Sequence, residues 1–273
     1  MAHNPEQPIQ LKELEQHLEK WREAECHEGR QDFIEDGMLD PSGWYRKEAV
    51  KALFILKEPN YSIERELKNT QGLYTDEALA NMAKTRWVRL RYLIQAYQRL
   101  GADKPLGGSF KHLQTIACGL QEANRDAYPS YESANKNRNA AAAHLAFMNL
   151  KKVPGGPTEG PEYRALAKRL QEAPDGTEAR RIKKQLEILF TFDQIRPRCV
   201  IVCCGNGGCR PFDALRSILD IKSSTNSGGV VTHWNGLPET PVFSTHHPNR
   251  AGELHYRDLM CQYQQYLRSI SAR

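Results

Sequence analysis

The chain has 273 residues, of which 40% are hydrophobic and 26% are charged. This balance excludes an integral membrane protein and disfavours a wholly disordered chain. The formal net charge of +5 makes the protein mildly basic, which is compatible with a polyanionic partner but does not demonstrate one. No apolar stretch is long enough to span a bilayer, and the N-terminus lacks the charged and then apolar order of a secretory signal. We therefore expect a cytoplasmic protein without membrane association.

Apolar residues along the chain fall into two patterns, one at helical spacing and one in short continuous runs. Helical spacing predicts four amphipathic helices, around residues 11–21, 87–100, 182–189 and 259–270. Short continuous runs are typical of buried parallel strands, and they occur at residues 50–56, 144–150, 199–204 and 242–245. Strands separated by helices imply right-handed crossovers and a parallel sheet covered on both faces.

The alternating pattern predicts one α/β domain with three layers, in which a short parallel sheet of four strands is flanked by helices. We expect this domain to cover residues 1–273, with residues 1–43 as an N-terminal helical extension and residues 44–273 as the core. Two segments have the composition of linkers, at residues 152–157 and 223–229. Each lies between elements of the same pattern, so neither is taken as a domain boundary.

The seven cysteines indicate neither a disulfide framework nor a metal site. Their number is odd and the chain has no export signal, which disfavours disulfides. The cluster of Cys199, Cys203, Cys204 and Cys209 has a spacing that matches neither a usual zinc site nor an iron-sulfur cluster. We expect Cys199, Cys203 and Cys204 to be small apolar residues of a strand, and we predict no metal.

Polar residues follow each of the four predicted strands. Ligands of open parallel sheets bind beyond the carboxyl ends of the strands, so these residues are the first candidates for a site. The four segments are Lys57 to Tyr61, Asn149 to Lys152, Gly205 to Gly208 and Thr245 to Arg250. A carboxylate, a carboxamide, a glycine turn and an imidazole are expected to converge there.

Together these segments resemble the motifs of the uracil-DNA glycosylase superfamily, over residues 50 to 270. Members carry an acidic or amide residue, a base-reading asparagine, a glycine and a His-Pro pair, each after a strand. The matching residues in chain order are Glu58, Asn149, Gly205 and His247-Pro248. The resemblance implies a glycosylase-like three-layer fold. It also implies an enzyme that flips a nucleotide out of single- or double-stranded DNA, hydrolyses its N-glycosidic bond and leaves an abasic site, without a cofactor.

The chemistry of this bond suits the residue types. Cleavage builds positive charge on the sugar and negative charge on the departing base. The resemblance implies that Glu58 orients and deprotonates water while stabilising the sugar, and that His247 donates a hydrogen bond to the base oxygen. Asn149 offers two donors and one acceptor to a pyrimidine edge. The alternatives are a surface turn residue for Glu58, a bond to turn backbone for Asn149 and a structural role for His247. His246 is expected either to pack in the fold or to support a neighbouring site residue.

A flipped base needs an aromatic platform, and the helix it leaves needs support. Tyr61 and Tyr74 are the candidates for stacking, with Tyr61 preferred, and Asn60 beside Tyr61 completes the expected base contacts. Asn249 and Arg250 follow the His-Pro pair, where family members hold the emptied helix, and Arg250 is also suited to a phosphate.

Other residues are candidates for binding the DNA backbone. The amides of Gly205 to Gly208, including Gly207, precede a helix predicted to begin near Pro211 and form a candidate phosphate cradle. Lys151 is a further expected DNA contact. The basic residues between 180 and 184 are interpreted as an exposed helix face, with direct DNA contact as the alternative.

The substrate stays open at this point. Leu56 or Lys57 stands where family members usually carry glycine, so uracil and a hypermodified phage cytosine, hydroxymethylated or glucosylated, are both candidates. They correspond to roles in DNA repair and in antiviral defence. No lysine is an obvious Schiff-base former, although Lys57 adjoins Glu58, so we expect a monofunctional enzyme. We also expect a monomer. The rival hypotheses are a non-catalytic nucleic-acid-binding protein and a nucleosidase acting on free nucleosides.

Overall fold

The structure is a computed structural model, which describes residues 9–25, 34–38, 40–44, 50–57, 88–89, 109–152, 161–190, 199–205, 210–219, 230–234, 237–246 and 252–271. The strands in this part of the chain are β1 (Ile34–Glu35), β2 (Gly37–Met38), β3 (Lys51–Leu56), β4 (Val88–Arg89), β5 (Leu145–Asn149), β6 (Cys199–Cys204), β7 (Val230–Trp234) and β8 (Leu237–Thr245). The helices are α1 (Ile9–Glu25), α2 (Pro41–Trp44), α6 (Ser109–Glu122), α7 (Tyr131–Asn137), the 3₁₀ helix η1 (Arg138–His144), α8 (Pro161–Glu172), α9 (Thr177–Phe190), α10 (Pro211–Ile218) and α11 (Glu253–Ser271).

The main sheet has the strand order β2-β5-β3-β6-β8-β7. Its four central strands, β5, β3, β6 and β8, are mutually parallel and correspond to the four predicted runs, whose assignment as parallel strands is confirmed. The outer strands β2 and β7 pair antiparallel with β5 and β8. The protein is therefore an α/β protein with a mixed sheet.

The prediction of a sheet with only four strands is wrong because the two edge strands were missed. β2 consists of Gly37 and Met38 alone, which is too short for a hydrophobic period to be recognised. β7 directly follows the segment taken as a possible linker. The helix predicted over residues 87–100 is wrong at Val88 and Arg89, which form β4 and pair in parallel with β1. The rest of that segment lies outside the described residues.

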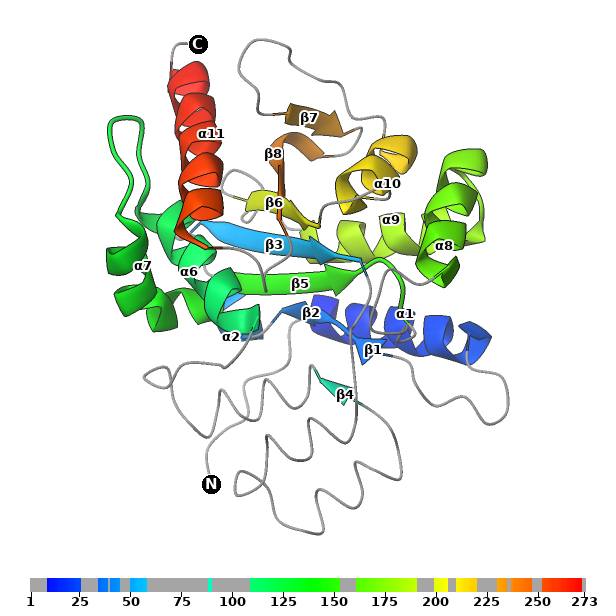
Figure 1. The fold of residues 1–273 in the computed structure, drawn as a ribbon. Helices are drawn as coiled ribbons and strands as arrows, with labels where there is room; N and C mark the ends of the chain where they lie inside the picture. Colours follow the sequence, from blue (N-terminus) through cyan, green and yellow to red (C-terminus); the bar gives the residue numbers. More distant parts are fainter. Residues whose placement is uncertain are drawn as a thin grey trace, which may run out of the picture.

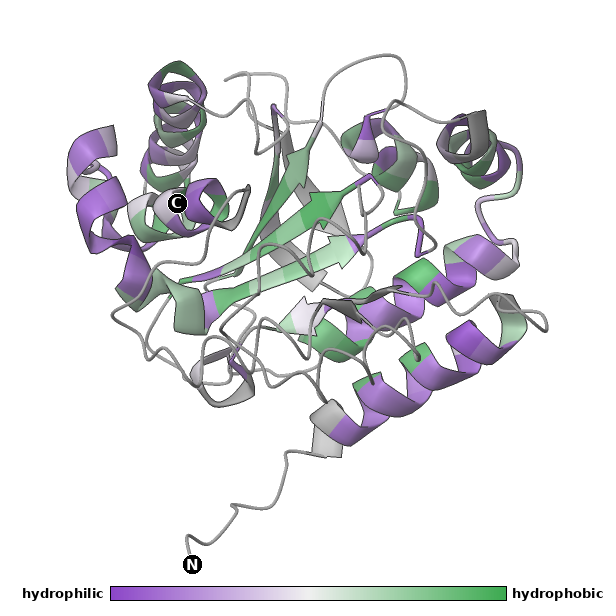
Figure 2. Ribbon diagram, turned by 60° about the horizontal axis from the view of Figure 1, so that its bottom comes forward, coloured by the Kyte–Doolittle hydropathy of each residue, from purple (hydrophilic) through white to green (hydrophobic). Residues whose placement is uncertain are grey.

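Helices cover both faces of the sheet, because successive residues of the central strands point to opposite sides. Leu53 and Ile55 of β3 belong to a core cluster shared with α1, α8, α9 and α10. Ala52 and Phe54 of the same strand belong to a second cluster shared with α6 and α11. Figure 1 shows these two sets of helices on either side of the strands. Figure 2 shows apolar strands between helices whose residues alternate in hydropathy. The arrangement is a three-layer sandwich.

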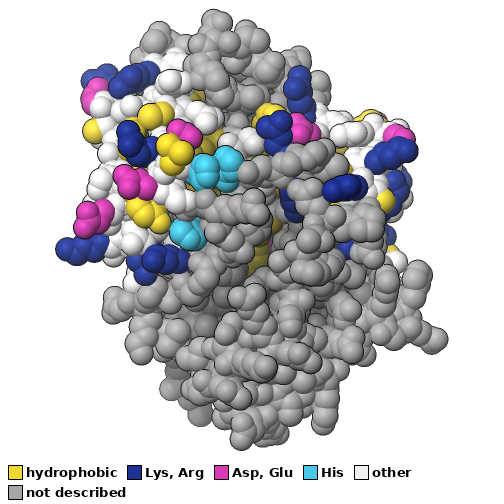
Figure 3. Space-filling model, in the orientation of Figure 1, with side chains coloured by type: hydrophobic (Ala, Val, Ile, Leu, Met, Phe, Trp, Pro, Cys, Tyr) yellow, Lys and Arg dark blue, Asp and Glu magenta, His cyan; other side chains and the backbone are white. Residues whose placement is uncertain are grey.

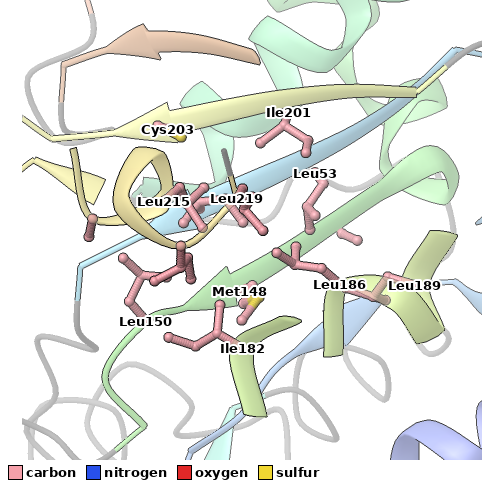
Figure 4. Packing of buried hydrophobic residues seen from close by; sticks show 14 of the residues in the cluster. Leu53, Met148, Leu150, Ile182, Leu186, Leu189, Ile201, Cys203, Leu215 and Leu219 are labelled. Carbon is pink, nitrogen blue, oxygen red and sulfur yellow. The ribbon is translucent and has the colours of Figure 1, made fainter. Parts of the chain in front are cut away.

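The first of these clusters places α9 and α10 against the parallel strands (Figure 4). Ile182 and Leu186 of α9 point toward Met148 of β5. Leu215 of α10 and Leu219, the residue after this helix, belong to the same cluster as Leu53 of β3 and Ile201 of β6. Burial of each such side chain contributes about 1.5–3 kcal/mol to folding. These contacts hold α9 and α10 against one face of the sheet.

The helix predictions at residues 11–21, 182–189 and 259–270 are confirmed by α1, α9 and α11. α10 begins at Pro211 as expected, since a proline suits the first helical position. Among the described helices, none has the length and apolar character needed to cross a membrane.

Three cysteines lie in β6, and their prediction as apolar strand residues is confirmed. Cys199, Cys203 and Cys204 are buried and carry free thiols. Burial alone raises the pKa of the Cys204 thiol, so the neutral form is favoured in the folded protein.

A Cys204→Ala variant should reveal this shift as a pH dependence of stability. The pKa of Cys204 is higher when folded than when unfolded. Its contribution to the free energy of unfolding is therefore fully present below about pH 9 and is lost as pH rises further. We expect the wild-type advantage over the variant to fall by up to about 1.4 kcal/mol per pH unit there. Urea unfolding of both proteins between about pH 7 and pH 10 measures it, and a difference independent of pH would contradict the prediction.

Candidate functional site

The carboxyl ends of the four parallel strands lie side by side. In the register of the sheet, Leu56 is opposite Asn149, and Cys204 is opposite Thr245. Backbone hydrogen bonds continue the pairing beyond the strands. The Lys151 amide donates to the Lys57 carbonyl oxygen at 3.0 Å, and the Gly205 amide donates to the Thr245 carbonyl oxygen at 2.9 Å. All four predicted strand-end segments therefore begin along one edge of the sheet.

The order of the strands marks one position along this edge. The chain passes from β3 to β5 on one side, and from β6 to β8 on the other. Ligands of open α/β sheets bind where neighbouring strands send the chain in opposite directions, which here is between β3 and β6. Lys57, the residue after β3, lies at this position, with its Nζ 5.7 Å from the ring centre of Tyr163 on α8. This distance is within the range of a cation–π contact.

Gly205, the residue after β6, lies directly under the Lys57 side chain. Its φ of +149° is in a region that favours glycine. A Cβ at this position would be 2.9 Å from Lys57 Cε and 3.2 Å from Pro211 Cδ. The glycine therefore allows the first and third strand ends to meet.

A Gly205→Ser substitution is expected to lower the free energy of unfolding by about 1–3 kcal/mol, because the backbone conformation disfavours any side chain. Chemical denaturation measures the loss. The matched control is Gly252→Ser, immediately before α11, where a Cβ would meet nothing within 4 Å and serine suits a helix N-cap. Equal stability of the two variants would contradict the prediction.

Asn149 closes β5 with its side chain turned away from solvent. The residue is 3% exposed, and its Oδ1 has no hydrogen-bond partner among the described residues. The alternative in which this oxygen bonds turn backbone is therefore not observed. A buried carboxamide oxygen without a partner is costly unless a ligand or water satisfies it. Among the described residues, no donor satisfies this oxygen.

A buried carboxylate lies behind Asn149. Asp36, between β1 and β2, is fully buried and accepts a hydrogen bond from the Asn149 backbone amide. Lys152 Nζ donates to both of its oxygens at 2.6 and 2.7 Å, and Gln185 Nε2 of α9 donates at 2.6 Å. Burial lowers the pKa of the Lys152 ammonium, while the Asp36 carboxylate acts in the opposite direction. The end of β5 is thus anchored to an interior ion pair.

His246, the residue after β8, packs on α11. Its ring stacks on the ring of His255, with centroids 3.6 Å apart and an interplanar angle of 21°. This contact agrees with the expected packing role of His246. His255 Nδ1 is buried and has no hydrogen-bond partner among the described residues.

The structure thus brings together three of the predicted site residues, which are Asn149, Lys151 and Gly205. The predicted residues outside the described part of the chain are Glu58, Asn60, Tyr61, Tyr74, Gly207, His247, Asn249 and Arg250.

Two of the basic residues of α9 are paired with acidic ones. Lys183 Nζ lies 2.8 Å from Asp175, and Lys184 Nζ lies 2.8 Å from Glu13 of α1. On the described surface of one face, Lys and Arg side chains are interspersed with Asp and Glu (Figure 3). The pairs of Lys183 and Lys184 favour the interpretation of the basic residues between 180 and 184 as a solvated helix face.

Within the described residues, no group of three or more His, Cys, Asp or Glu side chains has the arrangement of a metal site. The cysteines of β6 are therefore not gathered with other ligands there.

No family model, curated protein or solved structure matches this chain.

Sequence reasoning missed Asp36, Gln185 and Tyr163. Asp36 and Lys152 are 116 positions apart, and Asp36 and Gln185 are 149 apart. No local pattern links residues so distant in the chain. Lys152 carried the only signal, because it lies in the segment after a predicted strand.

Proposed function

We propose that this protein is a monofunctional DNA glycosylase with a uracil-DNA glycosylase-like fold. It would flip a uracil or modified pyrimidine nucleotide out of DNA and hydrolyse its N-glycosidic bond, without a cofactor. The observation that carries the proposal is the common edge of the four strand ends. Lys57 and His246, which directly precede Glu58 and His247 in the chain, follow two parallel strands of the same sheet.

The spacing of these two strands suits a nucleoside. One strand, β6, lies between β3 and β8, so their ends are about 10 Å apart, or two interstrand distances. That separation leaves room for a sugar and its base between a carboxylate after β3 and an imidazole after β8. Glu58 would then stabilise the oxocarbenium-like sugar and activate water, while His247 donates to the base oxygen.

Asn149 supplies the base-reading group of the proposal. Its Oδ1 is buried and lacks a partner among the described residues, so a base that donates a hydrogen bond would satisfy it. Tyr61 would stack on the base and Asn60 would contact it, as the resemblance implies.

Backbone contacts complete the proposed DNA site. Lys57 and Lys151 bring two positive charges to the strand ends, which favours phosphate binding. The amides that begin at Gly205 and continue to Gly207 precede α10 and its positive dipole end. Asn249 and Arg250 would hold the emptied helix.

The deciding experiment incubates the purified protein with genomic DNAs of different base composition, including phage DNA with hydroxymethylated or glucosylated cytosine. Mass spectrometry then identifies released bases, and alkali treatment detects abasic sites. Released uracil or modified cytosine supports the proposal and distinguishes repair from defence. If no DNA yields a base although the protein binds DNA in a salt-dependent way, a non-catalytic binder replaces it. If free nucleosides but not DNA raise the melting temperature, a nucleosidase replaces it.

A further inference from the structure

The ion pair of Asp36 and Lys152 is sealed in the interior. The two side chains are 0% and 1% exposed, and the Lys152 ammonium lies 4.9 Å from the ring centre of Trp21. The Asp36 carboxylate accepts from three groups, the Lys152 ammonium, the Gln185 carboxamide and the Asn149 backbone amide. Each of its two oxygens therefore accepts two hydrogen bonds.

These contacts join four segments that are distant in the sequence. Trp21 belongs to α1, Asp36 to the link between β1 and β2, Lys152 to the turn after β5 and Gln185 to α9. They meet where β5 ends, at Asn149. The contact with Asp36 uses the backbone of Asn149 and leaves its side-chain oxygen without a described partner.

Stability alone does not explain such a pair. Taking two charges out of water is costly, and apolar side chains of similar size usually stabilise a fold as well or better. A buried ion pair restricts the positions of its neighbours more than apolar side chains do, because its hydrogen bonds have defined directions. What it adds here is a fixed position for the end of β5.

We propose that Asp36 and Lys152 are positioning residues, which hold Asn149 so that its carboxamide faces the substrate base. The role of Asn149 rests on the proposed glycosylase function, whereas its anchoring does not. Gln185 supports the carboxylate from α9. The segment before β3 thereby acts on the site through Asn149.

The first test observes the Asn149 carboxamide by NMR, assigned by its loss in an Asn149→Ala variant. The double variant Asp36→Leu with Lys152→Met removes both charges together, so that neither is left buried alone. We expect the Asn149 side-chain signals to shift and broaden in this variant, and the backbone amide of Asn149 to exchange at least about tenfold faster, while Val202 in β6 keeps its rate.

The control for this test is Leu113→Ala in α6, a buried residue of the cluster on the opposite face. It weakens the fold without touching the ion pair and should leave the Asn149 side-chain signals unchanged. Unaltered Asn149 signals in the double variant would overturn the proposal. Faster exchange at Asn149 and Val202 alike would also overturn it, because the pair would then act on the whole fold.

The second test is a double-mutant cycle on base release. If Asp36 and Lys152 act through Asn149, their double variant lowers kcat/KM in the wild-type background but has no further effect in the Asn149→Ala background. Additive losses would overturn the proposal. If the wild-type protein releases no base from any DNA, the proposed function fails, and the NMR test alone decides whether the pair positions Asn149.

Discussion

A Glu58→Gln variant is expected to lose base release almost completely while keeping its fold and its affinity for DNA. The substitution preserves size and removes the charge and the basicity that the proposed mechanism requires of this residue. Loss of a positioned general base lowers turnover by about 10²–10⁴-fold. The measurement is the rate at which base is released from the DNA identified by mass spectrometry, under single-turnover conditions, so that slow product release does not mask the effect.

The matched control is Glu132→Gln, an exposed residue in the first turn of α7. It makes the same chemical change away from the strand ends and should release base at the wild-type rate. A Glu58→Gln protein with wild-type turnover would remove the carboxylate from the mechanism. Biological activity that survives with no base release would instead support the binding protein.

A Lys152→Met variant is expected to lower the free energy of unfolding by about 3–5 kcal/mol, because it leaves the Asp36 carboxylate buried without its counter-ion. Adding Asp36→Leu should restore most of this stability, since the second change removes the unpaired charge. Urea unfolding at pH 7 compares the wild type with both variants.

An ion pair of similar length at the surface provides the comparison. Lys183 Nζ and Asp175 are 2.8 Å apart, and the Asp175 side chain is 89% exposed. A Lys183→Met variant should cost far less stability than Lys152→Met, because water screens an ion pair at the surface. Contrary results would be a double variant as unstable as Lys152→Met alone, or equal losses for Lys152→Met and Lys183→Met.

The central strands could be predicted from the sequence because their signal is local. β3 and β6 are continuous apolar runs with nearly every residue buried, and such runs are recognisable without knowledge of their partners. The edge strand β2 gave no such signal, since two residues have no period. At Val88 and Arg89, helical spacing was misleading because pairing with β1 decides the local conformation.

The candidate site was predictable only in outline. The rule that ligands bind beyond strand ends selected Asn149, Lys151 and Gly205, which do lie along one edge. It did not indicate Asp36, because a carboxylate between two short strands has no recognisable partner in the sequence. The cation–π contact of Lys57 with Tyr163 also depends on how α8 packs, which follows from tertiary structure.

The antiparallel pairing of β2 with β5 has a consequence for shortened forms of the protein. A chain truncated to begin at residue 44 would lack Met38, which pairs with Ala146, and Asp36, which neutralises Lys152. The outer margin of β5 would then present unpaired amide and carbonyl groups, a template for self-association. An expression fragment of this protein should therefore retain the residues from α1 onward to stay free of aggregates.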